Sequence, residues 1–168
     1  MGALRRNFTF YDSMKEATNV VIRTAQKEDL DVLLPLVQAY RVFYKQEPDL
    51  ERERSFIERH LQNGTSVIYL AEVSGTPAGF MQLFKTYSTV HLANAWILED
   101  LFVAPEFRRR GVADALLAKA QQHALEDGAS GMFLETGYDN EDAQRVYERA
   151  GWTREGRFYK YNAPLERD

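Results

Sequence analysis

Three consecutive arginines followed by a glycine give the segment with the clearest chemical character in this chain. Arg108, Arg109 and Arg110 precede Gly111, and a helical pattern begins directly afterwards. Backbone N–H groups in the first turn of a helix lack internal partners and carry the positive end of the helix dipole, so they attract anions. Arginine side chains add charge-assisted hydrogen bonds to several phosphate groups at once. The segment therefore predicts a site for a polyphosphorylated ligand.

Two adjacent carboxylates, Glu99 and Asp100, interrupt an apolar strand pattern over Trp96–Val103. Adjacent strand residues point to opposite faces, so one of the two should face inward. A buried carboxylate is costly unless it holds a cation, such as an amine, or relays a proton through water. An alkylammonium with a pKa of about 10 must lose a proton before it can act as a nucleophile. We expect Glu99 to serve such an amine, with an ion pair or a solvent-facing carboxylate as the alternative, and Asp100 to be structural.

Several other chemistries find no support in the residue types. The chain has no cysteine, which excludes disulfides, thiolate metal sites and a cysteinyl intermediate. His60, His91 and His123 show no metal-ligand spacing, so we expect no metal site. A net charge of -4 without a broad basic face argues against a nucleic-acid partner. No apolar run approaches the roughly 20 residues of a membrane-spanning helix, and the start lacks a signal-peptide core, so we expect a cytoplasmic protein with no membrane partner.

The hydrophobic pattern predicts an α+β fold in one domain. Residues 1–19 read as a polar extension, and residues 20–168 as a single domain. The element order describes a mixed, mostly antiparallel sheet flanked by helices, rather than an alternating parallel fold. We expect strands at 20–22, 67–73, 78–84, 96–103, 132–135 and 157–161, and helices at 30–40, 56–61, 114–125 and 143–150.

This order and the arginine-rich turn together resemble the GNAT superfamily of acyl-CoA-dependent N-acetyltransferases, over roughly residues 20–162. In that family, a turn of pattern Arg/Gln-x-x-Gly-x-Gly/Ala binds the pyrophosphate of coenzyme A. Arg108, Gly111 and Ala113 fill its three fixed positions. The resemblance implies a GNAT fold and acetyl-CoA as cosubstrate, without a metal. The residues that it implies for cofactor binding are Leu101, Phe102, Val103, Arg108, Arg109, Arg110, Gly111, Val112, Ala113, Asp114, Asn140, Ala143 and Tyr147.

Asn140, Ala143 and Tyr147 lie at helical spacing, so they share one face of a helix, with Asn140 at the N-cap position. In the GNAT family, the corresponding Asn lies near the pantetheine arm, and the Tyr acts as general acid toward the leaving thiolate. A phenol with a pKa of about 10 can donate a proton to a thiolate whose conjugate acid has a pKa near about 8.5. The alternative for Tyr147 is an ordinary core aromatic. Leu101–Val103 are implied to bind the pantetheine amides through free backbone groups, as an added strand would.

The resemblance implies an N-acetyltransferase that moves the acetyl group of acetyl-CoA directly to a primary amine. Leu98–Val103 is similar to a strand of the diamine (spermidine/spermine) acetyltransferase branch, so we expect a small cationic acceptor such as a polyamine or an amino acid. The alternatives are a protein lysine or N-terminal acetyltransferase and a non-catalytic acyl-CoA sensor. Many members are dimers, and Phe158–Tyr161 predicts a strand that pairs two copies in a homodimer. Aromatic residues in the segments that shape the acceptor pocket are Tyr40, Phe43, Tyr44, Tyr87 and His91.

Overall fold

The computed structural model describes residues 19–165. The predicted extension over 1–19 lies outside these residues except for Asn19. The strands are β1 (Val20–Thr24), β2 (Val67–Val73), β3 (Thr76–Ser88), β4 (Ala93–Val103) and β5 (Met132–Phe133). The helices are α1 (Leu30–Phe43), α2 (Leu50–Asn63), α3 (Val112–Glu126) and α4 (Glu141–Arg149), with 3₁₀ turns at Lys27–Asp29 and Pro105–Phe107. No helix within 19–165 combines the length and apolarity needed to cross a membrane.

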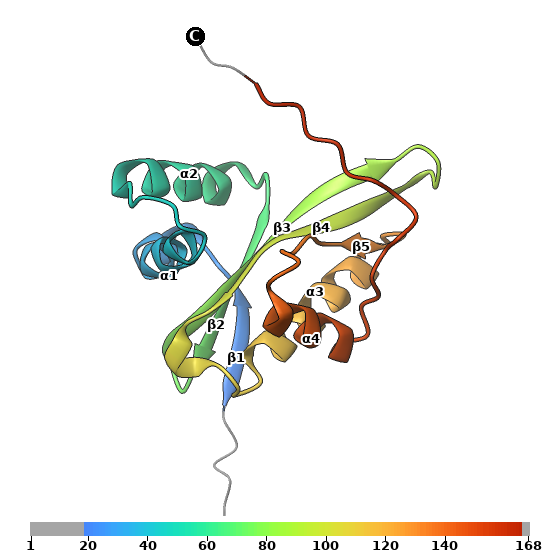
Figure 1. The fold of residues 1–168 in the computed structure, drawn as a ribbon. Helices are drawn as coiled ribbons and strands as arrows, with labels where there is room; N and C mark the ends of the chain where they lie inside the picture. Colours follow the sequence, from blue (N-terminus) through green and yellow to red (C-terminus); the bar gives the residue numbers. More distant parts are fainter. Residues whose placement is uncertain (1–18, 166–168) are drawn as a thin grey trace, which may run out of the picture.

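The strands form one sheet in the order β1-β2-β3-β4-β5. The first four are antiparallel neighbours, and β5 runs parallel to β4. Helices α1 and α2 lie on one side of this sheet, and α3 and α4 lie on the other (Figure 1). The predicted α+β class with a mixed, mostly antiparallel sheet is confirmed.

Each face of the sheet has its own hydrophobic core. Helix α3 buries Leu116 and Leu117 completely against strand residues such as Met81 and Leu83. On the opposite face, Leu33 of α1 is also fully buried, and it packs in a cluster built from α1, α2 and the strands. Burial of apolar side chains is the main favourable term in folding, so these two clusters hold the helices to the sheet. A side chain on a central strand therefore points into one of two cores, the one beneath α3 or the one beneath α1 and α2.

The hairpin between β2 and β3 turns through two residues. Ser74 and Gly75 have φ angles of 51° and 80°, so both lie in the left-handed region. Two such residues give a turn whose twist matches that of the flanking strands. Strand β3 consequently starts at Thr76, two residues earlier than the sequence pattern predicts, and it continues to Ser88. The long β3–β4 ribbon that results extends well beyond the rest of the sheet (Figure 1).

The predicted strand at 157–161 is wrong for the single chain. Residues 152–165 contain neither helix nor strand. Phe158, Tyr159 and Tyr161 are 78%, 89% and 89% exposed. A strand is stable only when a neighbour satisfies its backbone and its side chains are covered. Because β5 is only two residues long, it offers no edge for a five-residue partner.

Gly79 lets β3 and β4 approach closely, and replacing it should destabilise the sheet. A Cβ atom at this position would lie 2.4 Å from the carbonyl oxygen of Phe102. We expect Gly79→Ala to lower the free energy of unfolding by about 1–3 kcal/mol, because backbone atoms must move. Urea denaturation is the measurement. Gly131→Ala is the matched control, since nothing lies within 4 Å of its added Cβ; equal losses in the two variants would contradict the steric argument.

Candidate active site

The arginine-rich turn joins the end of β4 to the start of α3 and has the backbone of an anion-binding loop. Arg109 and Gly111 both have left-handed φ angles, 58° and 80°, and Gly111 is the N-cap of α3. The first backbone hydrogen bond of the helix runs from the N–H of Ala115 to the carbonyl of Gly111, at 3.0 Å. The N–H groups of Val112, Ala113 and Asp114 precede that bond, so they have no carbonyl partner within the helix. They face the N-terminal end of α3, where the helix dipole favours negative charge.

The three arginines of this turn are exposed, and none forms an ion pair with a carboxylate within residues 19–165. The Nε atom of Arg108 donates to the carbonyl of Val103 at 3.1 Å, and the Arg110 guanidinium lies 5.6 Å from the centre of the Phe107 ring. The positive charge of the turn is therefore not neutralised by a neighbouring acid.

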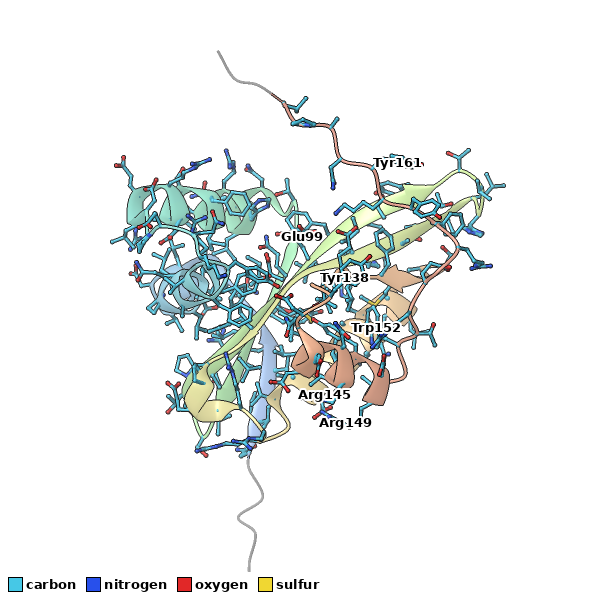
Figure 2. All side chains as sticks on the ribbon, in the orientation of Figure 1. Glu99, Tyr138, Arg145, Arg149, Trp152 and Tyr161 are labelled. Carbon is cyan, nitrogen blue, oxygen red and sulfur yellow. The ribbon has the colours of Figure 1, made fainter. Side chains whose placement is uncertain are left out.

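Two members of the predicted set are engaged in other contacts. The side chain of Val112 is 1% exposed and belongs to the core beneath α3, so only its backbone faces the turn. The carboxylate of Asp114 accepts hydrogen bonds from Arg149, the shortest at 2.8 Å, and so ties the first turn of α3 to the end of α4. The location of Arg149 at that end of α4 is visible in Figure 2. Because Arg149 neutralises Asp114, this acid does not oppose an anion at the turn.

Strands β4 and β5 separate after a very short contact. Their register pairs Trp96 with Met132 and Ile97 with Phe133, and the pairing ends there. Beyond this point, Leu98–Val103 pair with β3 alone among the described residues, while the chain after β5 turns away to reach α4 (Figure 1). The backbone of Leu101, Phe102 and Val103 therefore has an edge that no strand of the described chain covers. Such an edge can bind an extended ligand as an added strand.

A β-bulge at Glu99 decides which way the two carboxylates point. Gln82 pairs with Asp100, but the next β3 residue, Leu83, pairs with Leu98, which leaves Glu99 as the extra residue. A bulge of this kind reverses the alternation of side chains beyond it. Glu99 is exposed, whereas Asp100 is partly buried (Figure 2 shows Glu99). The inward-facing carboxylate of β4 is thus Asp100, where the sequence favoured Glu99.

Asp100 lies against α1. Burial raises the pKa of the Asp100 carboxyl to about 6, although the neighbouring Tyr40 hydroxyl partly offsets this effect. The pKa of Tyr40 is also raised, chiefly by burial and then by the adjacent Asp100 charge. The ring of Tyr40 stands 5.0 Å from that of Tyr44, one turn further along the helix. The carboxylate and the two tyrosines therefore form one contiguous polar group beside the open edge of β4.

Helix α4 presents Tyr147 toward the same region. Asn140 caps this helix, since its side-chain oxygen accepts from the N–H of Ala143 at 3.4 Å. Tyr147 is partly buried, with its ring 6.4 Å from that of Trp152. Burial, and secondarily the nearby Tyr44, raises the pKa of Tyr147 to about 12. Its hydroxyl is consequently protonated at neutral pH, and it is a weaker acid than a free phenol.

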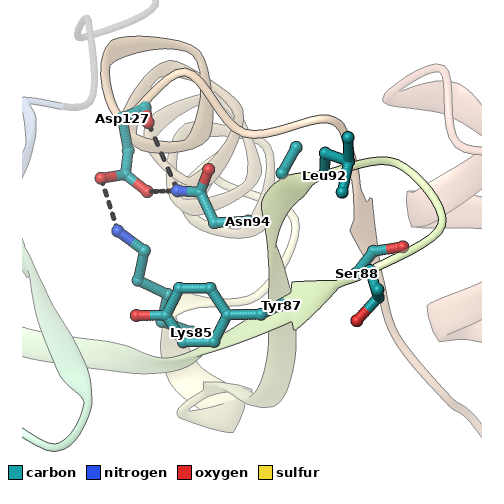
Figure 3. Close-up of a pocket in the computed structure, with 8 residues that line it drawn as sticks. Lys85, Tyr87, Ser88, Leu92, Asn94 and Asp127 are labelled. Atoms are coloured by element: carbon teal, nitrogen blue, oxygen red, sulfur yellow. Dashed lines mark hydrogen bonds and ion pairs between the residues drawn. The ribbon is translucent and has the colours of Figure 1, made fainter.

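The remaining aromatic candidates divide into two groups. Tyr40, Phe43 and Tyr44 lie together at the end of α1, with the Phe43 and Tyr44 rings 5.2 Å apart. Tyr87 instead lies near the tip of the β3–β4 ribbon, where it lines a pocket of about 580 Å³ together with Lys85, Asn94 and Asp127 (Figure 3). None of the predicted cofactor-binding or catalytic residues lines that pocket. No cluster of three or more His, Asp or Glu side chains suited to a metal ion occurs within residues 19–165.

Comparison with known proteins identifies this arrangement. The model of the Acetyltransferase (GNAT) family matches residues 33–152. The chain belongs to this family. It is 38% identical over 147 residues to an uncharacterized N-acetyltransferase, YhfO, of Bacillus subtilis. The aligned region covers 86% of this chain and 99% of the relative. These matches confirm the enzyme class, an acyl-CoA-dependent N-acetyltransferase.

Solved structures of GNAT proteins share the fold. The crystal structure of a probable acetyltransferase is 41% identical, with a TM-score of 0.83, and the match covers 88% of this chain and 99% of that one. An aminoglycoside N-acetyltransferase, AAC(6')-Iy, solved in complex with CoA, is 24% identical, with a TM-score of 0.73, over 88% of this chain and 97% of that one. The second likeness concerns the fold alone.

Sequence reasoning missed the inward position that the bulge gives to Asp100 in this GNAT chain. The sequence carries no signal for it, because every position around the two acids is apolar. In the structure, the residues buried against α3 change parity along β4. Trp96 and Leu98 pack on the α3 side, whereas beyond Glu99 the same side is reached by Leu101 and Val103. A change of parity inside one strand indicates an extra residue. The contacts of Asp114 with Arg149 and of Asp100 with Tyr40 join distant segments and have no local signal.

Asn140 has a structural task as the cap of α4, and its substitution tests how far that task explains it. We expect Asn140→Ala to lower the free energy of unfolding by about 1 kcal/mol, because the N–H of Ala143 loses its acceptor. Asn140→Ser should restore most of the loss, since a serine hydroxyl caps equally well. Urea denaturation measures both variants. If serine were as destabilising as alanine, capping would not be the source of the effect.

Proposed function

We propose that this chain binds acetyl-CoA along the open edge of β4 and transfers the acetyl group to the primary amine of a small cationic acceptor. The observation that carries the proposal is the early separation of β4 from β5. The uncovered edge at Leu101–Val103 leads directly into the arginine-rich turn. A ligand with amide groups in its middle and several phosphate groups at one end matches both the strand edge and the arginine-rich turn.

Binding of the cosubstrate follows from the groups on this path. The backbone of Leu101, Phe102 and Val103 would hydrogen-bond the pantetheine amides. The N–H groups at the start of α3 and the side chains of Arg108–Arg110 would hold the diphosphate. Across the opening, Asn140 and Ala143 begin α4 and would border the pantetheine arm.

The acceptor nitrogen must lose two protons, and the chain supplies two groups that handle them. The acceptor ammonium first releases one proton through water to Glu99, which is exposed and passes it to solvent. The amine nitrogen then bonds to the acetyl carbonyl carbon, and the carbon–sulfur bond breaks. The leaving sulfur takes the phenol proton of Tyr147, and the second amine proton restores that phenol. The products are an amide, a thiol and one released proton. Proximity of the two bound reactants supplies much of the rate.

A cationic acceptor is supported by the acids near the opening. Glu99 and Asp100 lie on β4 and carry no lysine or arginine partner within residues 19–165. Glu135, by contrast, pairs with Lys160 and contributes less net charge. The similarity of Leu98–Val103 to the diamine acetyltransferase branch agrees with a small alkylammonium as acceptor. The carboxylates of Glu99 and Asp100 favour positive charge by direct attraction.

We also propose that the enzyme is a homodimer in which residues 157–161 find the neighbour that the single chain lacks. Phe158, Tyr159 and Tyr161 are largely exposed, and large exposed aromatic groups of this kind are typical of interfaces. The aromatic-rich sequence of this segment favours a strand, so a second copy could supply its partner edge. Sedimentation velocity measures the mass of the assembly.

The arginine-rich turn should control cosubstrate affinity. We expect the double variant Arg109→Gln, Arg110→Gln to weaken acetyl-CoA binding by about tenfold or more, because two charge-assisted contacts to phosphate are lost. The dissociation constant is measured by isothermal titration calorimetry at fixed salt. The control is Arg52→Gln, Arg59→Gln, which removes two exposed arginines from α2. Equal weakening in both double variants would mean that net charge, and not the turn, attracts the ligand.

The function itself is tested by thiol release from acetyl-CoA over a panel of polyamines, amino acids, aminoglycosides and basic peptides. We expect turnover with a small primary amine, and a drop in kcat of about 100-fold in Tyr147→Phe, since the general acid is removed. Tyr138→Phe is the control, because Tyr138 is fully exposed just before α4 (Figure 2).

The other outcomes of this panel point to the two alternatives. Turnover confined to peptides would indicate a protein acetyltransferase. Tight acetyl-CoA binding without turnover on any acceptor would favour a sensor. Failure to bind acetyl-CoA at all would overturn the proposed site.

A further inference from the structure

The bulge in β4 gives the two neighbouring carboxylates different surroundings. Beyond the bulge, Leu101 and Val103 pack toward α3, whereas Phe102 is 6% exposed in the core beneath α1. Asp100 lies two residues before Phe102 and hence on the same face. Glu99, the extra residue, remains exposed. The α1 face of the sheet therefore receives a carboxylate at the level where β4 loses its β5 partner.

Aromatic rings surround this carboxylate. The Tyr40 ring lies 5.7 Å from that of Phe80 on β3 and 6.0 Å from that of Phe102 on β4, the strand that carries Asp100. Tyr44 continues the wall, 5.0 Å from Tyr40, and it is 47% exposed. Aromatic faces attract alkylammonium groups. These aromatic rings raise the free-energy cost of a charged, unpaired Asp100 carboxylate. They are also suited to contact a bound cation, which would lower that cost.

No cation of the described chain neutralises Asp100. The charged and titratable groups that act on it are Tyr40 of α1 and Glu99 of β4. Its partner residue on β3, Gln82, is neutral, and the Gln82 amide donates instead to the Ser66 hydroxyl at 2.6 Å. The nearby Arg41 of α1 is paired with Glu53 of α2 at 2.8 Å. A partly buried carboxylate without a cation is costly unless a ligand supplies one.

We propose that Asp100 is the residue that binds the acceptor amine, holding its primary ammonium against the wall formed by Tyr40 and Tyr44. This inference rests on the proposed function and refines it, since Glu99 keeps the task of passing the released proton to water. Two acids that differ in exposure can divide binding from proton release, which one solvated carboxylate would do less well.

The position of Tyr44 connects the acceptor to the leaving group. It contacts Tyr40 on one side and lies near enough to Tyr147 to raise the pKa of that phenol. Tyr44 therefore links Asp100, on the α1 face of the sheet, to Tyr147, which α4 presents from the other face across the uncovered edge of β4. The reaction itself limits the acceptor class, because a tertiary amine has no N–H to lose after attack and is excluded as a substrate.

The test compares Asp100→Asn and Glu99→Gln in steady-state kinetics with spermidine and with n-butylamine. We expect Asp100→Asn to raise the amine KM by about tenfold or more while the acetyl-CoA KM stays within about twofold, because only acceptor binding is lost. Glu99→Gln should lower kcat by about tenfold or more with a smaller change in amine KM. Glu126→Gln, which removes an exposed charge at the far end of α3, should change neither.

The pH profile separates a binding role from a structural one. Because the pKa of Asp100 is raised to about 6, kcat/KM for the amine should rise with pH through about 6 as the carboxylate ionises. Tyr40→Phe removes the hydroxyl that lowers this pKa, so the rise should move to higher pH; in Asp100→Asn the rise should disappear. The raised pKa also means that ionisation disfavours the folded state above about pH 4, so Asp100→Asn should fold at least as stably as wild type at pH 7.

A second measurement does not depend on turnover. Carbon NMR of protein labelled at aspartate carboxyl carbons should show one group that titrates near about 6, absent in Asp100→Asn, whose shift responds to spermidine in a 1:1 manner. A response to spermidine that persists in Asp100→Asn, or an unchanged amine KM in an enzyme that is otherwise active, would overturn the assignment of Asp100. Loss of acetyl-CoA binding or of all turnover in wild type would instead count against the proposed function.

Discussion

The structure depends on one local event, the end of hydrogen bonding between β4 and β5 after two residue pairs. A continuous parallel pair would satisfy the backbone of β4 on both sides and leave no room for a ligand. Because β5 leaves early, α4 is carried to the other side of an opening whose floor is an uncovered strand edge. Unpaired backbone groups are costly in a protein interior, and here a ligand with its own amides can satisfy them.

The bulge at Glu99 adds a second constraint on the same strand. The sheet separates two hydrophobic cores, so every side chain of β4 belongs to one half of the molecule. The extra residue shifts the alternation of side chains by one, so that a given parity of residue number faces one core before the bulge and the other core after it. Apolar residues before and after the bulge therefore remain buried. It also turns neighbouring carboxylates toward different environments, one toward water and one toward the tyrosines of α1.

Much of this architecture can be predicted from the sequence, because the relevant signals are local. The arginine-rich turn, the Asn140 cap and the mixed sheet follow from short motifs and from hydrophobic periodicity. The inward position of Asp100 could not be read in the same way, since strict alternation makes Glu99 and Asp100 equivalent choices until the register with β3 is known. The failure at residues 157–161 has a different cause. Their composition favours a strand, but strand formation requires an edge that β5 is too short to provide. Pairing of distant segments, as between Asp114 and Arg149, leaves no trace in either segment alone.

Helix α3 is fastened at both of its ends. Asp114 in its first turn is held by Arg149, and Asp127 at its C-cap accepts hydrogen bonds from Lys85 and from the indole of Trp96, each at 2.9 Å. These contacts at both ends oppose movement of the helix along its axis, since such a shift would stretch both sets of bonds at once. The arginine-rich turn therefore keeps a fixed distance from the β3–β4 ribbon. For a ligand that is anchored at this turn and extends to the middle of β4, this fixed distance determines where its reactive end lies along the strand.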